Sequence, residues 1–243
     1  MMAIDRPSSP ASLLTSVLLT DAVGCAAVVL VGIAARSSLG LSGWYPLKAV
    51  LLFSAVMLVV LGGLASLHPF TRFGPANQVT AARAGMVALV GALLAEPNTS
   101  AAATAACLTG ILVAALDGLD GWLARRSGTA SPFGARFDME VDALLILALS
   151  LLAWQYGKAG AWIVLAGLLR YMFVAGGWVA PWLARPLDAS FRRKAVCVLQ
   201  IAGSCVILLP VVPAALSAPT GAVLLAVLSW SFLVDVLRLW RRR

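Results

Sequence analysis

Long apolar stretches, separated by short polar segments, constrain the fold of this chain more than any other feature. A helix needs about 20 mainly apolar residues to cross the hydrocarbon core of a bilayer. With 61% hydrophobic residues and a mean hydropathy of +0.96, the composition excludes an ordinary soluble domain. We therefore expect an all-α fold, a polytopic membrane helical bundle. Its candidate spans are 12–35, 47–67, 79–96, 101–124, 137–157, 159–180, 194–215 and 218–238.

Basic residues predict how these spans are oriented. If the eight spans alternate, Arg and Lys cluster on one side, whereas the connections 96–100 and 210–220 on the other side carry no basic residue. The positive-inside rule then places both termini on the cytoplasmic face. The polar segment 68–78 is interpreted as an interfacial turn or short helix. It separates two N-terminal spans, residues 1–70, from a six-span core, residues 71–243.

The net charge of +8 bears on the partners of the chain. In a membrane protein it indicates topology and a preference for anionic lipid headgroups. We expect no nucleic-acid partner, because no basic patch is interleaved with stacking aromatic side chains. The four cysteines lie within apolar runs and form no Cys-x-x-Cys pair, so free buried thiols are expected rather than disulfides or a zinc site.

Acidic residues are concentrated between Asp117 and Asp142, where five of the ten in the chain lie. Residues three and four apart share a helix face. Asp117 and Asp120 therefore lie on one face of the first helix, and Asp138 and Asp142 lie on one face of the next. Four converging carboxylates repel one another unless cations lie between them. An all-oxygen site suits Mg²⁺ first, and Mn²⁺ or Ca²⁺ after it. Glu140 points away from the shared face and is left out of the site.

This cluster has three other interpretations. The carboxylates can be surface residues that pair with Arg125, Arg126 and Arg136. Alternatively, the chain can be a divalent-cation transporter with an acidic filter, but acids would then continue through the bilayer, and the outer halves of the spans have none. The third is a catalytically silent membrane scaffold, which is disfavoured because Asp117, Asp120, Asp138 and Asp142 are all present.

The same segment resembles the signature of the CDP-alcohol phosphotransferase family, and the resemblance covers about residues 75–240. It implies a six-helix catalytic core that transfers a substituted phosphoryl group from a CDP-linked donor to an alcohol and releases CMP. It further implies a divalent-metal site, with two ions, and a homodimer. The matching identities, at the family's spacing, are Asp117, Asp120, Gly121, Ala124, Arg125, Gly134, Asp138 and Asp142.

The resemblance assigns roles to individual residues. Asp117, Asp120 and Asp138 would bind metal, and Asp142 would complete the metal cluster and act as general base on the acceptor hydroxyl. The CDP donor would be bound by Asn77, Thr80, Gly121, Arg125 and Ser131.

Several of the donor residues also have a purely structural interpretation. The pattern Asn77-x-x-Thr80-x-x-Arg83 is similar to the start of the family's first core helix, although Ala76 separates Pro75 from Asn77, and Asn or Thr here can simply cap the helix. Gly121 would let a flat ligand approach the backbone, or would only allow helices to pack closely.

Basic residues in the later spans are candidates for the acceptor. We expect Arg170 and Lys194, with Arg193 as a further candidate, to hold an anionic alcohol; interfacial anchoring is the alternative. The best prediction is transfer from CDP-diacylglycerol to sn-glycerol 3-phosphate on the cytoplasmic face of the membrane. Inositol phosphate, inositol or serine are alternative acceptors, and relatives with CDP-choline-type donors share the motif.

Overall fold

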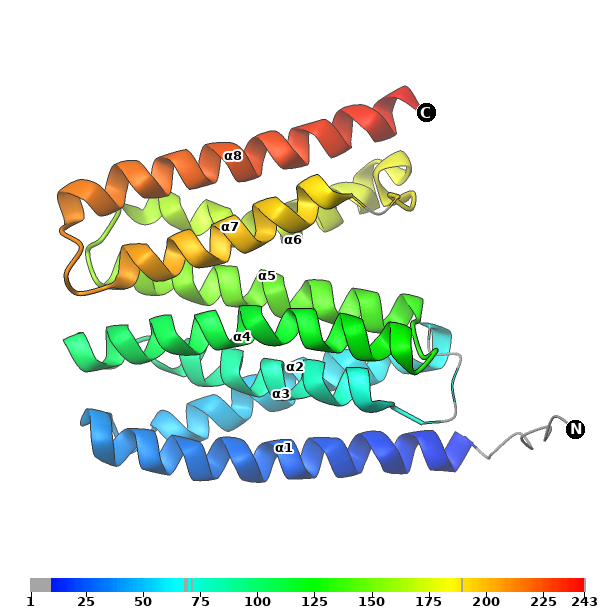
Figure 1. The fold of residues 1–243 in the computed structure, drawn as a ribbon, viewed down its shortest axis with the longest axis horizontal. Coiled ribbons are helices and arrows are strands. Elements are labelled where there is room, and N and C mark those ends of the chain that lie inside the picture. Colours follow the sequence, from blue (N-terminus) through cyan, green and yellow to red (C-terminus); the bar gives the residue numbers. More distant parts are fainter. Residues whose placement is uncertain (1–9, 68–69, 71, 189, 243) are drawn as a thin grey trace, which may run out of the picture. The chain divides into compact units, whose positions relative to one another are not determined.

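The computed structural model describes residues 10–67, 70, 72–188 and 190–242, which form helices joined by short connections (Figure 1). No strand occurs within these ranges, and the predicted all-α class is confirmed. In chain order the elements are α1 (Pro10–Leu39), α2 (Tyr45–Leu67), α3 (Pro75–Ala92), α4 (Ser100–Arg126), α5 (Pro132–Gln155), the 3-10 helix η1 (Ala161–Val164), α6 (Leu165–Val179), the 3-10 helix η2 (Pro181–Ala184), α7 (Phe191–Leu208) and α8 (Ala214–Arg241).

Several of these helices can cross a membrane, so the prediction of a multi-pass membrane protein is confirmed. The sequence predicts eight spans. The helices α3, α5 and α7 are too polar to count as apolar spans, because each carries charged or amide side chains near its start. Those polar residues include Asn77 of α3 and Asp138 of α5, two of the residues predicted for the site. In the described chain, the five segments of sufficient length and hydropathy are Leu13–Leu39, Tyr45–Gly62, Ser100–Arg126, Ala161–Val179 and Ala214–Arg241.

The predicted interfacial segment 68–78 lies in the connection between α2 and α3 and runs into the first turn of α3. Residues 68, 69 and 71 lie outside the described residues. The proposed division between residues 70 and 71 falls in this connection and stays a prediction.

The first of two compact units comprises residues 1–92 and 115–141. Within it α1, α2 and α3 pack against one another. Glycines allow this close packing: a Cβ at Gly24 of α1 would lie 2.5 Å from the ring of Phe53 of α2, and one at Gly85 of α3 would lie 3.1 Å from Val28 of α1. Small residues at such crossings let membrane helices approach closely.

Three phenylalanines in the first unit connect the start of α3 to the start of α5. The ring centroids of Phe73, Phe133 and Phe137 lie 6.2 to 6.3 Å apart, and all three side chains are buried. Aromatic rings at this separation attract one another beyond their burial alone. The cluster therefore fixes the N-terminal turns of α3 and α5, which carry candidate site residues, beside each other.

The second unit comprises residues 93–114 and 142–243. Glycines again mark the tight contacts: a Cβ at Gly167 of α6 would lie 2.4 Å from Leu147 of α5, and one at Gly203 of α7 would lie 2.4 Å from Leu224 of α8. Gln155, at the end of α5, accepts a hydrogen bond from the backbone N–H of Ala95 at 2.8 Å. At two of these contacts, α5 with α6 and α7 with α8, a leucine thus lies where the glycine of the facing helix lacks a Cβ.

Candidate active site

Three carboxylates converge within the first unit, near the end of α4 and the start of α5. Asp117 and Asp120 lie three residues apart on α4, and Asp138 lies in the second turn of α5. Each offers one carboxylate oxygen, and these oxygens lie within 4.8 Å of one another. Asp120 is buried, and the other two are partly exposed. Oxygen ligands suit a hard divalent cation such as Mg²⁺, so this carboxylate triad fits a metal ion.

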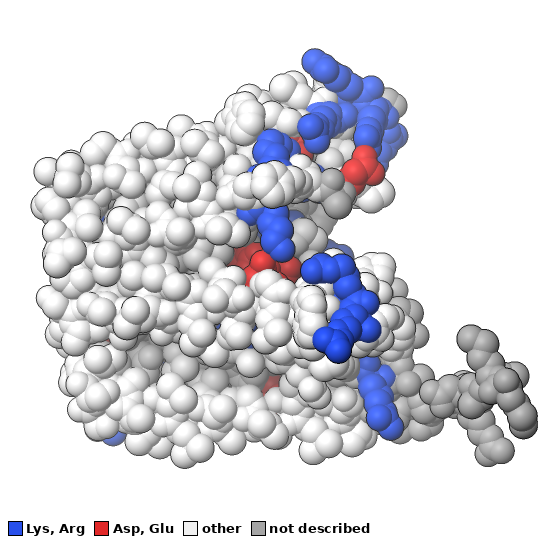
Figure 2. All heavy atoms as spheres, viewed as in Figure 1, with Lys and Arg blue, Asp and Glu red and all other residues white. Residues whose placement is uncertain are grey.

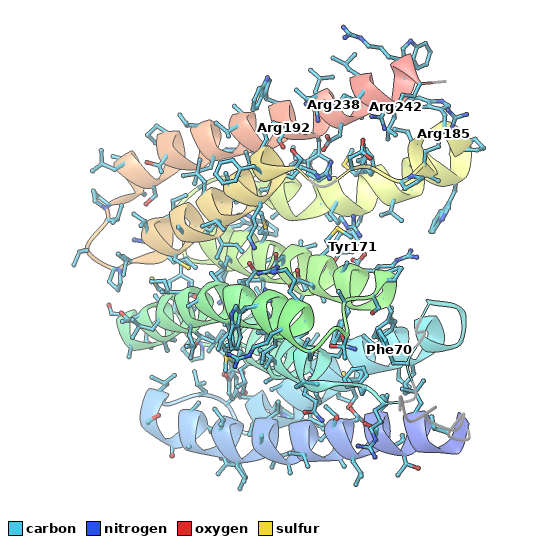
Figure 3. All side chains as sticks on the ribbon, turned by 45° about the vertical axis from the view of Figure 1, so that its right-hand side comes forward. Phe70, Tyr171, Arg185, Arg192, Arg238 and Arg242 are labelled. Carbon is cyan, nitrogen blue, oxygen red and sulfur yellow. The ribbon has the colours of Figure 1, made fainter. Side chains whose placement is uncertain are left out.

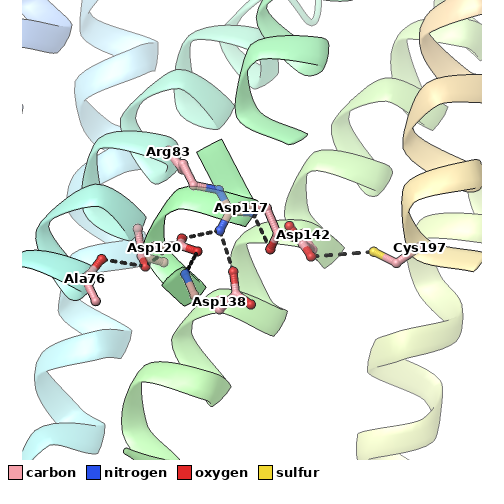
Figure 4. A network of polar contacts seen from close by, with 9 residues as sticks. Ala76, Arg83, Asp117, Asp120, Asp138, Asp142 and Cys197 are labelled. Carbon is pink, nitrogen blue, oxygen red and sulfur yellow. Dashed lines mark hydrogen bonds and ion pairs between the residues drawn. The ribbon is translucent and has the colours of Figure 1, made fainter. Parts of the chain in front are cut away.

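The guanidinium of Arg83, from α3, lies among these carboxylates (Figure 4). Its side chain is fully buried, with Nη1 2.6 Å from Oδ2 of Asp120 and Nη2 3.4 Å from Oδ1 of Asp117. Nη1 also forms an ion pair with Oδ1 of Asp138. Three ionised carboxylates and one guanidinium leave a formal charge of −2. A net charge is costly where it is even partly removed from water, and one divalent cation would balance this one.

Asp120 is held by two further donors besides Arg83. The Thr80 hydroxyl lies 3.1 Å from Oδ2 of Asp120, and the Gly121 backbone N–H donates to Oδ1 at 2.7 Å. The carbonyl of Ala76, one turn earlier on α3, lies at the same distance of 3.1 Å and competes for the single proton of this hydroxyl. Both carboxylate oxygens of Asp120 are therefore oriented before any ligand arrives.

Asn77 and Ser131, both predicted to contact the CDP donor, meet around Gly134. The Asn77 amide donates to the carbonyl of Phe73 at 2.5 Å, and Ser131 Oγ accepts the N–H of Gly134 at 3.0 Å. This second bond is a helix N-cap for α5. A Cβ at Gly134 would lie 2.9 Å from Oδ1 of Asn77. Only glycine therefore lets Asn77 lie against the start of α5 in this position.

The structure distinguishes two adjacent arginines at the end of α4. Arg126 lies over the Trp122 ring, 4.9 Å from its centroid. Arg125 instead lies over Gly121, where an added Cβ would be 3.4 Å from its Nη1. Arg125 is therefore placed beside the small residue that follows Asp120, where a phosphate could contact its guanidinium.

Asp142 lies on α5, one turn beyond Asp138, and belongs to the second unit. The Cys197 thiol of α7 donates to its Oδ2 at 3.5 Å (Figure 4). The group of three described above does not include Asp142. Its predicted roles as fourth metal ligand and general base stay predictions.

The residues predicted to bind the acceptor lie in the second unit. Arg193 pairs with Asp235, Nη1 to Oδ1 at 3.4 Å, and also donates to the carbonyl of Asp188. Arg170 is partly buried on α6, and Lys194 is exposed on α7. In this unit the basic side chains gather toward the end where α8 finishes (Figure 2).

A further arginine near this end is structural. Arg192 of α7 donates to the carbonyl of Ser231 at 2.5 Å and pairs with Oδ1 of Asp235, also at 2.5 Å. Figure 3 shows Arg192 between α7 and α8, with Arg185 and Arg242 closer to the C-terminal end of α8. Arg192 and Asp235 thus hold α7 against α8.

Sequence reasoning did not place Arg83 in the site, although two signals pointed to it. It lies three residues after Thr80, so the two share a face of α3. It is also an ionisable residue inside a predicted span, which is a functional candidate by default. The pattern Asn77-x-x-Thr80-x-x-Arg83 thus carries a third site residue besides its Asn and Thr.

One comparison with known proteins identifies the relatives of this chain. The model of the CDP-alcohol phosphatidyltransferase family matches residues 73–235, well over half of the chain. No solved structure matches the chain. The family match confirms the resemblance stated from the motif. It contains every residue of the carboxylate triad and Arg83, and it leaves α1 and α2 outside.

Proposed function

Because this chain belongs to the CDP-alcohol phosphatidyltransferase family, we propose that it transfers the phosphatidyl group of CDP-diacylglycerol to sn-glycerol 3-phosphate and releases CMP. The observation that carries the proposal is the carboxylate triad around the buried Arg83 guanidinium. The family membership favours this enzyme over the divalent-cation transporter considered from the sequence.

Asp117, Asp120 and Asp138 would hold the divalent cation, which we propose to be Mg²⁺ or Mn²⁺, with Asp142 contributing to a second ion. When bound, such cations neutralise the pyrophosphate of the donor and stabilise the leaving CMP. Arg83 fixes the positions of the three carboxylates from the buried side, so they need not reorganise during the reaction. Preorganised charge of this kind supplies much of the catalytic effect in many enzymes.

The residues of the first unit would bind the donor. Arg125 would contact a phosphate of CDP, with the small Gly121 beside it leaving room for the ligand. Asn77, Thr80 and Ser131 would line the nucleotide end. Because Thr80 and Asn77 are already hydrogen-bonded within the protein, their contribution is to fix the shape of the site as well as to contact the ligand.

Asp142 would act as general base. The acceptor hydroxyl oxygen attacks the phosphorus that carries the diacylglycerol group, the bond from that phosphorus to the CMP oxygen breaks, and the hydroxyl proton moves to the Asp142 carboxylate. CMP then leaves with the bonding electron pair. The Cys197 thiol, which donates to Oδ2 of Asp142, would orient this carboxylate.

The choice of acceptor follows from charge. Arg170, Lys194 and Arg193 would provide fixed cations for a phosphorylated alcohol, which favours sn-glycerol 3-phosphate. Inositol phosphate is the next candidate for the same reason, and inositol and serine follow. The proposal also places the site on the cytoplasmic face, from the basic residues, and the working form as a homodimer, from the family.

The test uses the purified full chain in detergent or lipid with CDP-diacylglycerol, Mg²⁺ or Mn²⁺, and a panel of radiolabelled alcohols. Release of CMP and the labelled phospholipid are both measured, with EDTA and the Asp120→Asn variant as controls. We expect metal-dependent transfer, highest with sn-glycerol 3-phosphate. Transfer to another alcohol alone would disprove the acceptor, and no CMP release with any donor or alcohol would disprove the activity.

A further inference from the structure

A groove of about 990 Å³ runs between α1 and α3 in the first unit. It lies away from the carboxylate triad. Gln78 lines the groove, whereas Thr80 faces Asp120, and these positions differ by roughly 200° around a helix of 3.6 residues per turn. The groove and the triad therefore occupy opposite faces of α3.

The floor of the groove is formed by small residues. Gly24 of α1 and Gly85 of α3 line it, and both lie against the buried ring of Phe53 from α2, which an added Cβ would approach to 2.5 Å at Gly24 and 3.8 Å at Gly85. Ala82, also on α3, is exposed to the groove. These residues leave a trough at a place where larger side chains would fill the space between the helices.

The lining changes character along the groove. Its polar residues gather at the end where α3 begins, with the guanidinium of Arg72, the amide of Gln78 and the hydroxyl of Ser16. Farther along, the walls are apolar and include Val23 and Met86. Arg72 is exposed, so its charge is available at this end. A cation beside an apolar trough complements an anionic headgroup attached to a hydrocarbon chain.

The length of the groove fits one leaflet of a bilayer. On α1 the lining extends from Thr15 to Val31, which is about 24 Å at about 1.5 Å per residue. One leaflet, taken as half of the roughly 40 to 45 Å that a bilayer measures with its headgroup regions, is about 20 to 22 Å thick, close to the length of the groove. α1 is itself one of the segments long and apolar enough to span the membrane, so the groove opens toward lipid.

We propose that this groove binds one phospholipid of the surrounding bilayer that has an anionic headgroup. Its phosphate contacts Arg72 and Gln78, and one acyl chain lies in the trough between α1 and α3. The CDP-linked donor is not the occupant, because its pyrophosphate belongs at the carboxylates on the other face of α3. The site depends on α1, which lies outside the residues that match the family. It therefore gives the N-terminal helices a function of their own.

The test counts bound lipid on the purified full chain by native mass spectrometry. Micelles contain phosphatidylglycerol or phosphatidylcholine with identical acyl chains. Arg72→Gln removes the cation, and Ala82→Trp fills the trough from an exposed position. The matched controls are Arg126→Gln, an exposed arginine elsewhere in the same unit, and Leu30→Trp, an exposed position of α1 outside the groove. Thermal unfolding confirms that each variant is folded.

We expect the wild type to retain one phosphatidylglycerol per chain in preference to phosphatidylcholine. Arg72→Gln should weaken retention about fivefold, the usual effect of one basic residue at a membrane surface, and Ala82→Trp should abolish it. Both controls should behave as the wild type.

Equal retention of the two lipids, or unchanged retention in both groove variants, would overturn the proposal. One-for-one displacement by CDP-diacylglycerol, but not by CMP, would also overturn it and assign the groove to the donor. If Ala82→Trp fails to fold, the comparison of Arg72→Gln with Arg126→Gln decides. Because the readout is lipid retention, it is independent of whether the transfer reaction is assigned correctly.

Discussion

Nη1 of Arg83 lies 2.6 Å from Oδ2 of Asp120, and both side chains are buried. Replacement of a buried ion pair by apolar residues can be neutral, but removal of one partner leaves an uncompensated buried charge. Here the arginine serves three carboxylates at once, so its loss leaves all three without their buried cation. Arg83 and a metal ion thus stabilise the same group of charges.

Arg83→Gln should therefore destabilise the metal-free protein, by about 3 to 5 kcal/mol as for other broken buried pairs. Added Mg²⁺ should raise the melting temperature of this variant more than that of the wild type, because the carboxylates then have only the metal to neutralise them. Arg83→Lys keeps the charge, so its stability should lie between those of Arg83→Gln and the wild type. Thermal unfolding in EDTA and in Mg²⁺ measures these melting temperatures. Equal stability of Arg83→Gln and wild type in EDTA would contradict it.

The triad itself gives a prediction with an internal control. Asp120→Asn should lower metal-dependent CMP release by about 100-fold or more, since even residues that only orient metal ligands contribute about 10- to 100-fold. Glu140→Gln, on the same helix as Asp138 but outside the group of three, should keep its metal-dependent activity. Mn²⁺ affinity, measured by calorimetry, should fall only in the first variant. An equal loss of CMP release in Glu140→Gln would show that the metal site is assigned to the wrong residues.

Gly134→Ala tests the contact between α5 and Asn77. The added Cβ would lie 2.9 Å from Oδ1 of Asn77, so the amide must move, and overpacking of this kind costs about 1 to 3 kcal/mol. We expect a higher KM for CDP-diacylglycerol together with a lower melting temperature.

Gly118→Ala is the matched control for this change. It is also helical, but an added Cβ at Gly118 meets nothing within 4 Å. Removing a helical glycine there should leave KM unchanged and stabilise the protein by up to about 1 kcal/mol. If the two variants behave alike, the close approach at Gly134 does not matter to the site.

Regular spacing along a helix allowed part of the site to be predicted, and contacts between helices account for the rest. Asp117 and Asp120 fall on one face by their three-residue separation, so two members of the triad could be paired from sequence. The approach of Gly134 to Asn77, 57 positions away, depends on how α3 packs against α5, and no local pattern encodes it. Arg83 lies between these cases, because its face was predictable but its partners were not.

The membrane class was predictable because bilayer thickness sets the length of an apolar stretch. Within the residues that the structure describes, the eight α-helices agree with the eight predicted stretches in order, although the third ends at Ala92 rather than residue 96. Ala95, with φ of 61°, lies in the turn that follows. The groove between α1 and α3 could not be foreseen, because an apolar periodicity is uninformative in helices that are apolar nearly all round.

Asp142→Asn should separate chemistry from binding. The amide cannot accept the acceptor proton as a base, so kcat should fall while CDP affinity changes little, and the Mn²⁺ ion held by Asp117, Asp120 and Asp138 should remain bound. Cys197→Ala removes only the thiol that donates to Oδ2, and its loss of kcat should be smaller. Steady-state kinetics with CDP-diacylglycerol, together with CDP titration, measure both variants. Activity near wild type in Asp142→Asn would remove Asp142 from the role of base.

Two carboxylates in the second unit should contribute very differently to stability. Asp235 has a side chain only 5% exposed and pairs with Arg192 at 2.5 Å, so Asp235→Ala should cost about 3 to 5 kcal/mol. Asp188 is 82% exposed and pairs with Arg242 at 2.9 Å, and exposed pairs contribute little. Thermal unfolding at neutral pH should therefore show a large drop for Asp235→Ala and a small one for Asp188→Asn.

The small contribution of Asp188 should also depend on pH in a defined direction. The hydrogen bond from Arg242, and then its charge, lower the pKa of Asp188 below its ordinary value of 3.8. A carboxyl whose pKa is lower in the folded state stabilises the protein above its unfolded pKa, and this effect is lost as the pH falls through the folded pKa. The difference in melting temperature between wild type and Asp188→Asn should thus be constant from pH 7 to about 5 and shrink below about 3.8. A difference that grows on acidification would mean that Asp188 is not held by Arg242 in the folded protein.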